Sequence, residues 1–251
     1  MKRRVVAGLT IAGVLALAAC GGALWNEYLR MPASAPLALP ATLVPLASPE
    51  GQRLLAESDR RADYGALSAS FVPQTRKAYC GVASAITVLN AAGIDDAPRD
   101  PEALFAPADV PLNPLKVSFS GMSLRGLAGL LRAHGADAEM FPASATDKSA
   151  FRELARANLG REGDYLLVNY QRAGLGQERM GHISPVAAYH APSDRLLILD
   201  VASHKYPPVW ADLDEVWEAM RAPLNPETTT TRGFIVVRGN RPGATALADA
   251  P

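Results

Sequence analysis

The sequence predicts an α+β fold in which helices come first along the chain and strands follow. Between residues 81 and 160, apolar residues recur at helical spacing, whereas residues 165–238 contain short apolar, β-rich runs bounded by turn residues. A chain of 251 residues that is 49% hydrophobic can bury one core of ordinary size. Helices and strands segregated in this way favour an α+β arrangement over alternating βαβ units.

The N-terminus has the pattern of an export signal. Basic residues at positions 2–4 precede an apolar stretch at residues 5–19, which has signal-peptide length and ends in small residues. Residues 17–20 (LAAC) are similar to a bacterial lipobox, in which Cys20 is lipidated and becomes the mature N-terminus. An uncleaved membrane anchor is the alternative, because no charge appears between residues 5 and 25. Both interpretations place the rest of the chain on the periplasmic side of a bacterial membrane.

Two segments at the ends of the chain are compositionally biased. Residues 21–57 are rich in proline and alanine, which predicts a tether or extended chain lying along the domain, because proline disfavours helices and central strands. Residues 239–251 are rich in glycine, proline and alanine and are expected to be disordered. The predicted folded domain therefore covers residues 58–238.

Three helices are predicted in the first half of this domain. Each carries apolar residues at helical spacing and ends at or before a glycine, and the second and third begin after a side chain that can cap a helix. They are residues 81–92 before Gly93, residues 124–134 between Ser123 and Gly135, and residues 148–159 between Asp147 and Gly160.

The second half is predicted to form strands, with one more helix. The runs are short, apolar or β-branched, and each is bounded by turn residues. The predicted strands are residues 165–170, 183–189, 196–200 and 233–238, and the predicted helix is residues 213–220.

The charge balance excludes a nucleic-acid-binding protein. Lysine and arginine together number 25, and so do aspartate and glutamate. Such a chain has no net basic charge to attract a phosphate backbone.

The cysteine count directs attention to a single thiol. The sequence contains only Cys20 and Cys80. If Cys20 is acylated, the mature protein cannot form an internal disulfide, and a lone thiol in an oxidising compartment is either buried and inert or retained for chemistry. Cys80 is therefore a candidate nucleophile.

The surroundings of Cys80 favour the chemical role. Cys80 stands directly before the predicted helix 81–92, and the free N–H groups and dipole at a helix start are expected to lower the thiol pKa. Gln74 lies six residues upstream, where its amide could join the Cys80 N–H in stabilising an oxyanion. Taken alone, a glutamine is more often solvated surface.

Four histidines could exchange a proton with this thiol. His182 opens the predicted strand 183–189, so its side chain projects from a rigid element. His134 lies in the last turn of a predicted helix, where the dipole favours it, His190 in a turn, and His204 in a proline-rich loop. His182 is therefore the predicted base.

Asp200 is predicted to orient His182. If residues near Ala191 form the turn of an antiparallel hairpin, paired positions have numbers that add to 382, and His182 faces Asp200. Cross-strand neighbours have Cβ atoms about 5 Å apart, which lets a carboxylate hold an imidazole in one tautomer. A slip of one residue in register would remove this pairing.

Four blocks of sequence resemble the phytochelatin synthase family, especially its short bacterial members. The blocks occur in family order and are QTRKAYCGVASAITVLNAAGID (residues 74–95), GHISPVAAYH (181–190), LILDVASHKYPPVW (197–210) and RGFIVV (232–237). The resemblance implies a papain-like fold with a helical half followed by an antiparallel-sheet half. It also implies a catalytic triad of Cys80, His182 and Asp200, with Gln74 at the oxyanion.

The resemblance further implies where the substrate binds. The γ-glutamylcysteinyl group is bound in the family near positions that correspond here to Gly81, Asn169, Gly181 and Arg232. A guanidinium at Arg232 could hold a substrate α-carboxylate in bidentate fashion. One departure is Ser203, which stands three residues after the triad aspartate where many members have arginine, so a contact to substrate or acceptor is expected to be weaker.

The implied activity is that of a glutathione γ-glutamylcysteinyltransferase. Such an enzyme cleaves glycine from glutathione through a γ-Glu-Cys acyl-enzyme and passes the acyl group to water, which we favour here, or to a second glutathione. The alternatives are a papain-like peptidase or amidase acting on cell-envelope peptides and, far less favoured, a metal-thiolate protein, for which one free cysteine and scattered histidines give no ligand spacing.

No built-in cofactor or metal site is expected. Heavy-metal ions such as Cd or Zn would enter as metal–glutathione complexes, and metal sensing attributed to the cysteine-rich C-terminal half of plant members is not expected from these residues. The membrane and glutathione are the expected partners, and the sequence leaves a homodimer open.

Overall fold

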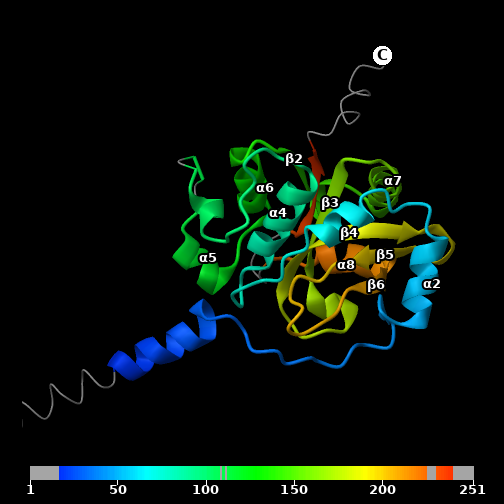
Figure 1. Ribbon diagram of the computed structural model, residues 1–251. Coiled ribbons are helices and arrows are strands. Elements are labelled where there is room, and N and C mark those ends of the chain that lie inside the picture. Colours follow the sequence, from blue (N-terminus) through cyan, green and yellow to red (C-terminus); the bar gives the residue numbers. More distant parts are fainter. Residues whose placement is uncertain (1–16, 108, 111, 225–229, 240–251) are drawn as a thin grey trace, which may run out of the picture.

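A seven-stranded antiparallel sheet organises the part of the chain that the computed structural model describes, residues 17–107, 109–110, 112–224 and 230–239 (Figure 1). Its strand order is β1-β6-β5-β4-β3-β7-β2, and neighbouring strands pair antiparallel throughout. The strands are β1 (Val44–Pro45), β2 (Asp137–Pro142), β3 (Asp164–Gln171), β4 (Gly181–His190), β5 (Arg195–Ile198), β6 (Val209–Asp212) and β7 (Gly233–Arg238).

Helices cover both faces of this sheet. Alternate side chains of a strand point to opposite faces, so Leu167 packs into one hydrophobic cluster and Leu166 into the other. On the first face lie α2 (Pro49–Glu57), α3 (Tyr64–Ala69), α4 (Cys80–Ala91) and α6 (Leu124–Ala133), and on the second α7 (Lys148–Leu159) and α8 (Leu213–Arg221). The predicted α+β, papain-like architecture is confirmed, with the addition that two helices flank the second face.

Shorter helical segments complete the described structure. A helix in residues 17–24 continues into the π-helical turn η1 (Trp25–Leu29), which contacts α5 (Pro114–Ser120). The remaining 3-10 turns are η2 (Ala103–Phe105), η3 (Ala143–Ala145), η4 (Arg172–Leu175) and η5 (Ala191–Ser193).

The predicted helix starts agree with the observed ones. The Ser123 side chain accepts a hydrogen bond from Gly126 N at the start of α6, and the Asp147 side chain accepts one from Ala150 N at the start of α7. Each satisfies one of the backbone donors that a helix start leaves unpaired. The predicted helix 213–220 is α8.

The predicted register of the β4–β5 hairpin is wrong. Val186 pairs with Ile198 and Ala188 with Leu197, so paired numbers add to 384 or 385 rather than 382. A 3-10 turn that ends at Asp194 in the left-handed region (φ 50°) displaces the register, and a β-bulge between Val186 and Ala188 changes it again. Strand β5 ends at Ile198, so Asp200 lies beyond the strand rather than within it.

The expected domain boundary at residue 58 lies inside the folded unit. Leu43 is buried, β1 pairs with β6, and α2 places Leu54 and Leu55 in the core. Residues 31–40 run along the domain without regular secondary structure, and Ala35 N and Leu37 N donate to the carbonyls of His204 (2.8 Å) and Lys205 (2.9 Å). The tether interpretation therefore fails for residues 43–57, because their apolar side chains are used in packing.

The ends of the chain fall largely outside the described residues. Residues 1–16, which hold most of the predicted export signal, and residues 240–251, which hold nearly all of the predicted disordered tail, are not described. Within the described ranges, no helix has both the length and the apolar character needed to cross a bilayer.

Candidate active site

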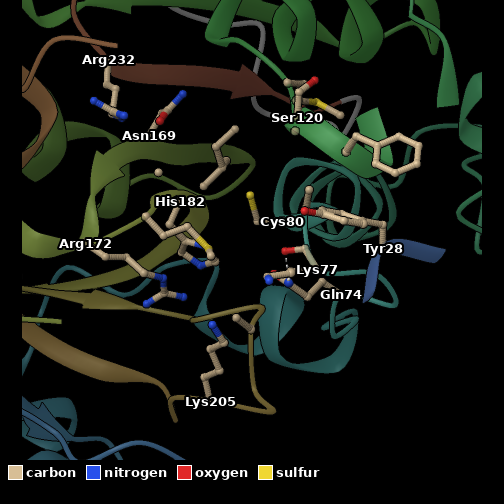
Figure 2. A pocket seen from close by; sticks show the side chains of 18 of the residues that line it. Tyr28, Gln74, Lys77, Cys80, Ser120, Asn169, Arg172, His182, Lys205 and Arg232 are labelled. Atoms are coloured by element: carbon tan, nitrogen blue, oxygen red, sulfur yellow. Dashed lines mark hydrogen bonds between the residues drawn. The ribbon is translucent and has the colours of Figure 1, made fainter. Parts of the chain in front are cut away.

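A cavity of about 380 Å³ opens where the start of α4 meets strands β3 and β4 (Figure 2). Cys80 and His182 line it, and so do Gln74, Asn169, Gly181 and Arg232. These six residues were all singled out from the sequence, and they come from five separate segments of the fold. Asp200 lies behind His182 and contacts it directly.

Helix α4 fixes the position of Cys80. The helix is apolar nearly all round and buried from Gly81 to Leu89, so it lies inside the domain rather than on its surface. The Ser84 hydroxyl donates to the carbonyl of Ile183 on β4 at 3.1 Å, which ties the two elements together. Cys80, the first residue of the helix, and His182, which precedes Ile183 on β4, line the same cavity.

The expected lowering of the Cys80 pKa is not found. Burial raises the pKa of the thiol, and this outweighs the opposing effects of the Ile183 and Gly81 backbone amides and of the Arg172 charge. Desolvation of the thiolate thus exceeds the stabilisation that a helix start provides. Before substrate binds, Cys80 is a neutral thiol at neutral pH.

His182 is buried, neutral and fixed in orientation. Burial, together with the charge of Arg172, lowers its pKa to about 4, although Asp200 opposes the shift. Its Nε2 lies 2.9 Å from Asp200 Oδ1 and 2.9 Å from Ser184 Oγ. Because a neutral imidazole carries one N–H, donation from Nε2 to the carboxylate leaves Nδ1 as the proton acceptor.

Asp200 is ionised and held by an arginine that the sequence did not reveal. Arg172 donates from both terminal nitrogens to the two carboxylate oxygens, each at 2.8 Å, and Ala202 N donates to Oδ1 at 2.9 Å. Burial alone would raise the pKa of Asp200, but His182 and Arg172 hold it well below its usual range. The carboxylate therefore keeps its charge while it orients His182.

Arg172 is itself buried, and neighbouring side chains hold it in place. It follows β3 directly, donates to Gln177 Oε1 at 2.6 Å and lies 4.9 Å from the centre of the Tyr206 ring. A basic residue just after a predicted buried strand was the signal available in the sequence. Nothing in the sequence shows that the chain brings it back against Asp200, 28 residues later.

Gln74 lines the cavity, but its amide hydrogens are already in use. Nε2 donates to the carbonyls of Arg76 (3.1 Å) and Lys77 (3.0 Å), and Oε1 has no partner among the described residues (Figure 2). Donation to an oxyanion therefore requires the side chain to turn from these carbonyls. The oxyanion role of Gln74 stays a prediction.

Three of the four predicted substrate-binding positions face the cavity. Asn169 and Gly181 line it, and the buried Arg232 lies beside them, donating to the carbonyls of Ala222 (2.9 Å) and Pro223 (2.7 Å). Burial lowers the pKa of Arg232, and its guanidinium forms no ion pair within the described part of the chain. A carboxylate of a ligand could supply one.

Gly81 does not line the cavity. A Cβ at this position would approach the Met122 side chain to 2.7 Å, so the glycine permits close packing of α4 rather than contact with a ligand. Ser203, the departure from the family pattern, is exposed and also lies outside the cavity lining.

The other histidines have different surroundings. His134 Nε2 lies 2.9 Å from the Leu104 carbonyl. His190 closes β4 rather than lying in a turn, and is 2.7 Å from Ser193 Oγ. His204 does line the cavity, where burial lowers its pKa, and the sequence interpretation did not select it.

The described residues contain no group of three or more histidine, cysteine, aspartate or glutamate side chains placed to hold a metal ion. The cavity is lined by the Cys80 thiol and the neutral His182 imidazole, and the ionised Asp200 carboxylate contacts His182 from behind. Such an arrangement can perform nucleophilic acyl transfer, with the imidazole taking and returning a proton.

A family model and several curated proteins match most of this chain. The model of the phytochelatin synthase family matches residues 35–234. Glutathione gamma-glutamylcysteinyltransferase 3 of Lotus japonicus is 34% identical over 203 residues, which cover 77% of this chain and 42% of that protein. Glutathione gamma-glutamylcysteinyltransferase 1 of Triticum aestivum is 35% identical over 203 residues, covering 77% and 40%. The chain thus spans about two fifths of the length of these curated relatives.

Proposed function

Because the chain belongs to the phytochelatin synthase family, we propose that it acts on glutathione as a γ-glutamylcysteinyltransferase with Cys80 as nucleophile. The observation that carries the proposal is the contact of His182 Nε2 with Asp200 Oδ1 at 2.9 Å beside the cavity that Cys80 lines. A cavity of about 380 Å³ with Arg232 in its wall suits a small anionic peptide better than a long one.

The first half-reaction forms an acyl-enzyme. His182 Nδ1 accepts the Cys80 proton as the sulfur attacks the cysteinyl carbonyl of glutathione, and a C–S bond replaces the carbonyl π bond. Collapse of the oxyanion then breaks the C–N bond to glycine, whose nitrogen takes the proton back from His182. The products are free glycine and a γ-Glu-Cys thioester on Cys80.

The second half-reaction transfers the acyl group. Water attacks the thioester carbonyl, His182 accepts its proton and returns it to the leaving sulfur, and γ-Glu-Cys is released. The amine of a second glutathione can attack instead, which lengthens the peptide. We propose that water is the preferred acceptor and that heavy-metal ions such as Cd or Zn take part only as complexes with the glutathione thiol.

Rapid mixing of the full-length protein with glutathione, followed by mass spectrometry, tests the proposal. We expect a γ-Glu-Cys adduct on the Cys80 peptide and one glycine released per enzyme molecule in the first turnover. Cys80→Ser should retain the fold, measured by circular dichroism, and release no glycine. Turnover above a few per cent of wild type in Cys80→Ser would exclude the proposed nucleophile.

We also propose that the protein is exported to the periplasmic side of a bacterial membrane and anchored through a lipid on Cys20, with an N-terminal membrane anchor as the alternative. Cys20 is exposed and lies in the helical residues 17–24, before the chain reaches the turn η1. These features support attachment without loss of the folded unit.

A further inference from the structure

We propose that the turn η1 forms a wall on the acceptor side of the cavity and that Tyr28 is the residue that favours water over a second glutathione. This inference rests on the proposed function. Tyr28 is half-buried and lines the cavity together with Cys80, although it lies in the segment that the sequence assigned to a tether.

Two independent contacts hold the wall in place. The Tyr28 ring lies 4.9 Å from the Phe119 ring at the end of α5. On its other side, Lys77 lies 5.8 Å from the Tyr28 ring centre and forms an ion pair with Glu27. The hydrogen bond with Glu27 raises the pKa of Lys77, so the ammonium stays charged. Phe119 and Lys77 themselves line the cavity.

The chain after the turn continues past the same cavity. In Figure 1 the blue segment passes α5 and then runs along the edge of the domain. There the backbone of Ala35 and Leu37 bonds to His204 and Lys205, both of which line the cavity. One stretch of chain, residues 25–37, thus touches residues on two separate parts of the cavity lining.

The wall lies across Cys80 from the residues proposed to hold the acyl group. In Figure 2, Arg232 and Asn169 lie on one side of Cys80, and Tyr28 and Lys77 lie on the other. If γ-Glu-Cys occupies the Arg232 side, the departing glycine and then the acceptor must use the Tyr28 side. The ring therefore limits the size of the acceptor.

Charge reinforces this limit. An incoming glutathione carries two carboxylates, but the Lys77 ammonium is already paired with Glu27, and Lys205 is paired with Glu178 at 2.6 Å. A water molecule is small and uncharged, so it is hindered neither by the Tyr28 ring nor by the pairing of the two lysines. Because exposed ion pairs are weak, we expect the Tyr28 ring to contribute more to acceptor choice than Glu27 does.

The acceptor claim is tested by the product ratio in full-length variants. With glutathione as the only substrate, mass spectrometry measures the ratio of the transfer product, (γ-Glu-Cys)₂-Gly, to γ-Glu-Cys. We expect Tyr28→Ala to raise this ratio on the order of tenfold, the discrimination that one apolar contact can provide, and Glu27→Gln to raise it less. Tyr28→Phe keeps the ring and should restore the wild-type ratio. Glu50→Gln removes an exposed, arginine-paired carboxylate on α2 and serves as the matched control.

A second measurement does not depend on glutathione. The rate at which a bulky maleimide modifies Cys80, divided by the rate for iodoacetamide, reports how far the wall restricts access, and peptide mass spectrometry counts Cys20 separately. Tyr28→Ala should raise this quotient. If Tyr28→Ala raises the quotient but the wild-type protein never cleaves glutathione, Tyr28 does restrict access to Cys80 and the proposed function is wrong.

The opposite results overturn the inference. If wild type cleaves glutathione but Tyr28→Ala changes neither the quotient nor the product ratio, Tyr28 is no wall. If the quotient rises but the product ratio does not, Tyr28 restricts access to the Cys80 thiol without affecting whether water or glutathione is the acceptor. The proposed role of Tyr28 in acceptor specificity is then wrong.

Discussion

Burial sets the protonation of the reacting groups before substrate arrives. It raises the pKa of the Cys80 thiol and lowers that of His182 to about 4, so the two rest as a neutral pair at neutral pH. His182 must then act as a general base during attack, rather than as the imidazolium partner of a preformed thiolate. Behind this neutral pair, Asp200 and Arg172 carry opposite charges and contact each other directly.

This arrangement predicts a low acid limit for activity. His182 can accept a proton only while it is neutral, so kcat/KM for glycine release should fall as pH drops through the folded pKa of about 4, rather than near 6.5. The measurement is initial rate against pH, with circular dichroism to confirm folding at each point. An acid limb near 6.5 would show that His182 titrates as if exposed.

The same shifts predict how stability depends on pH. The folded pKa values of His182 and Asp200 both lie below their ordinary values, so the unfolded chain binds more protons as pH falls. Their contribution is complete above about pH 6.5, the ordinary histidine value, and is lost progressively below it. Urea unfolding between pH 7 and pH 4 should show a falling free energy of unfolding, and a constant value would contradict the buried, neutral His182.

Arg172 is expected to act through Asp200 and His182. Arg172→Met removes two hydrogen bonds from a buried carboxylate, which should lower the free energy of unfolding by about 3–5 kcal/mol in urea titration. Its charge also lowers the pKa of His182, so the acid limb of kcat/KM should move up. Arg172→Lys keeps a charge without the bidentate contact and should give a smaller shift. An unchanged limb in Arg172→Met would leave the residue a purely structural role.

Steady-state kinetics can distinguish two roles for Gln74, oxyanion stabilisation and support of the loop before α4. If its amide turns from the carbonyls of Arg76 and Lys77 to the oxyanion, Gln74→Ala should cost roughly 10²–10³ in kcat, the usual effect of losing one oxyanion donor. If the amide only holds the loop before α4, the loss should appear in KM and stability instead. Steady-state kinetics on glycine release, with urea unfolding alongside, distinguish the two.

At the scale of elements, helix α4 and strand β4 together carry the nucleophile and the base. Their link is the hydrogen bond from Ser84 Oγ to the Ile183 carbonyl, and Ser84 is fully buried. Ser84→Ala should lower the free energy of unfolding by about 1 kcal/mol. Because the bond also sets the distance between Cys80 and His182, kcat should fall several-fold.

A helix cap away from the cavity supplies the control for that variant. Ser123→Ala removes the N-cap of α6 and should also cost about 1 kcal/mol in urea unfolding. Ser123 does not line the cavity, so kcat should stay at the wild-type value. Equal losses of kcat in the two variants would show that lowered stability, rather than the α4–β4 link, reduces activity.

The sequence predicts those elements whose signals are local. Periodicity and caps located α4, α6 and α7, and short, mainly apolar runs bounded by turn residues located β3, β4 and β7. The four-residue strand β6 and the two-residue strand β1 carry too short a pattern to stand out from loop. The β4–β5 register could not be obtained, because a bulge and a left-handed Asp194 change it without any distinctive residue pattern.

The residues of the candidate site likewise fall into those that the sequence revealed and those that it did not. The motif around Cys80 and the strand-opening His182 could be found along the chain, and their resemblance to one family placed Asp200 even though the hairpin argument for it was wrong. Arg172 and Tyr28 could not be found, because each acquires its position only when distant segments pack together. A proline-rich flank gave no reason to expect that Tyr28 would return to the cavity.

At the scale of the whole molecule, the N-terminal segment connects the proposed lipid anchor at Cys20 with the proposed role of Tyr28 in acceptor choice. Residues 17–24 are helical and lead directly into the turn that carries Tyr28. Tyr28 lies eight positions after Cys20, which is about 12 Å along a helix at 1.5 Å per residue. A lipid on Cys20 would therefore hold the acceptor side of the cavity close to the bilayer surface.

Replacing Cys20 tests this placement. Cys20→Ser should abolish incorporation of labelled fatty acid and move the protein to a soluble or unprocessed fraction, because the thiol that carries the lipid is gone. The purified variant should still release glycine from glutathione at the wild-type rate, since Cys20 is exposed and does not line the cavity. If wild type never incorporates the label yet sediments with membranes, the uncleaved anchor is the correct interpretation. Were Cys20→Ser instead to lose turnover while remaining folded, the lipid or its attachment would be acting on the wall at Tyr28, and anchoring and acceptor choice would have to be treated as one property of the chain.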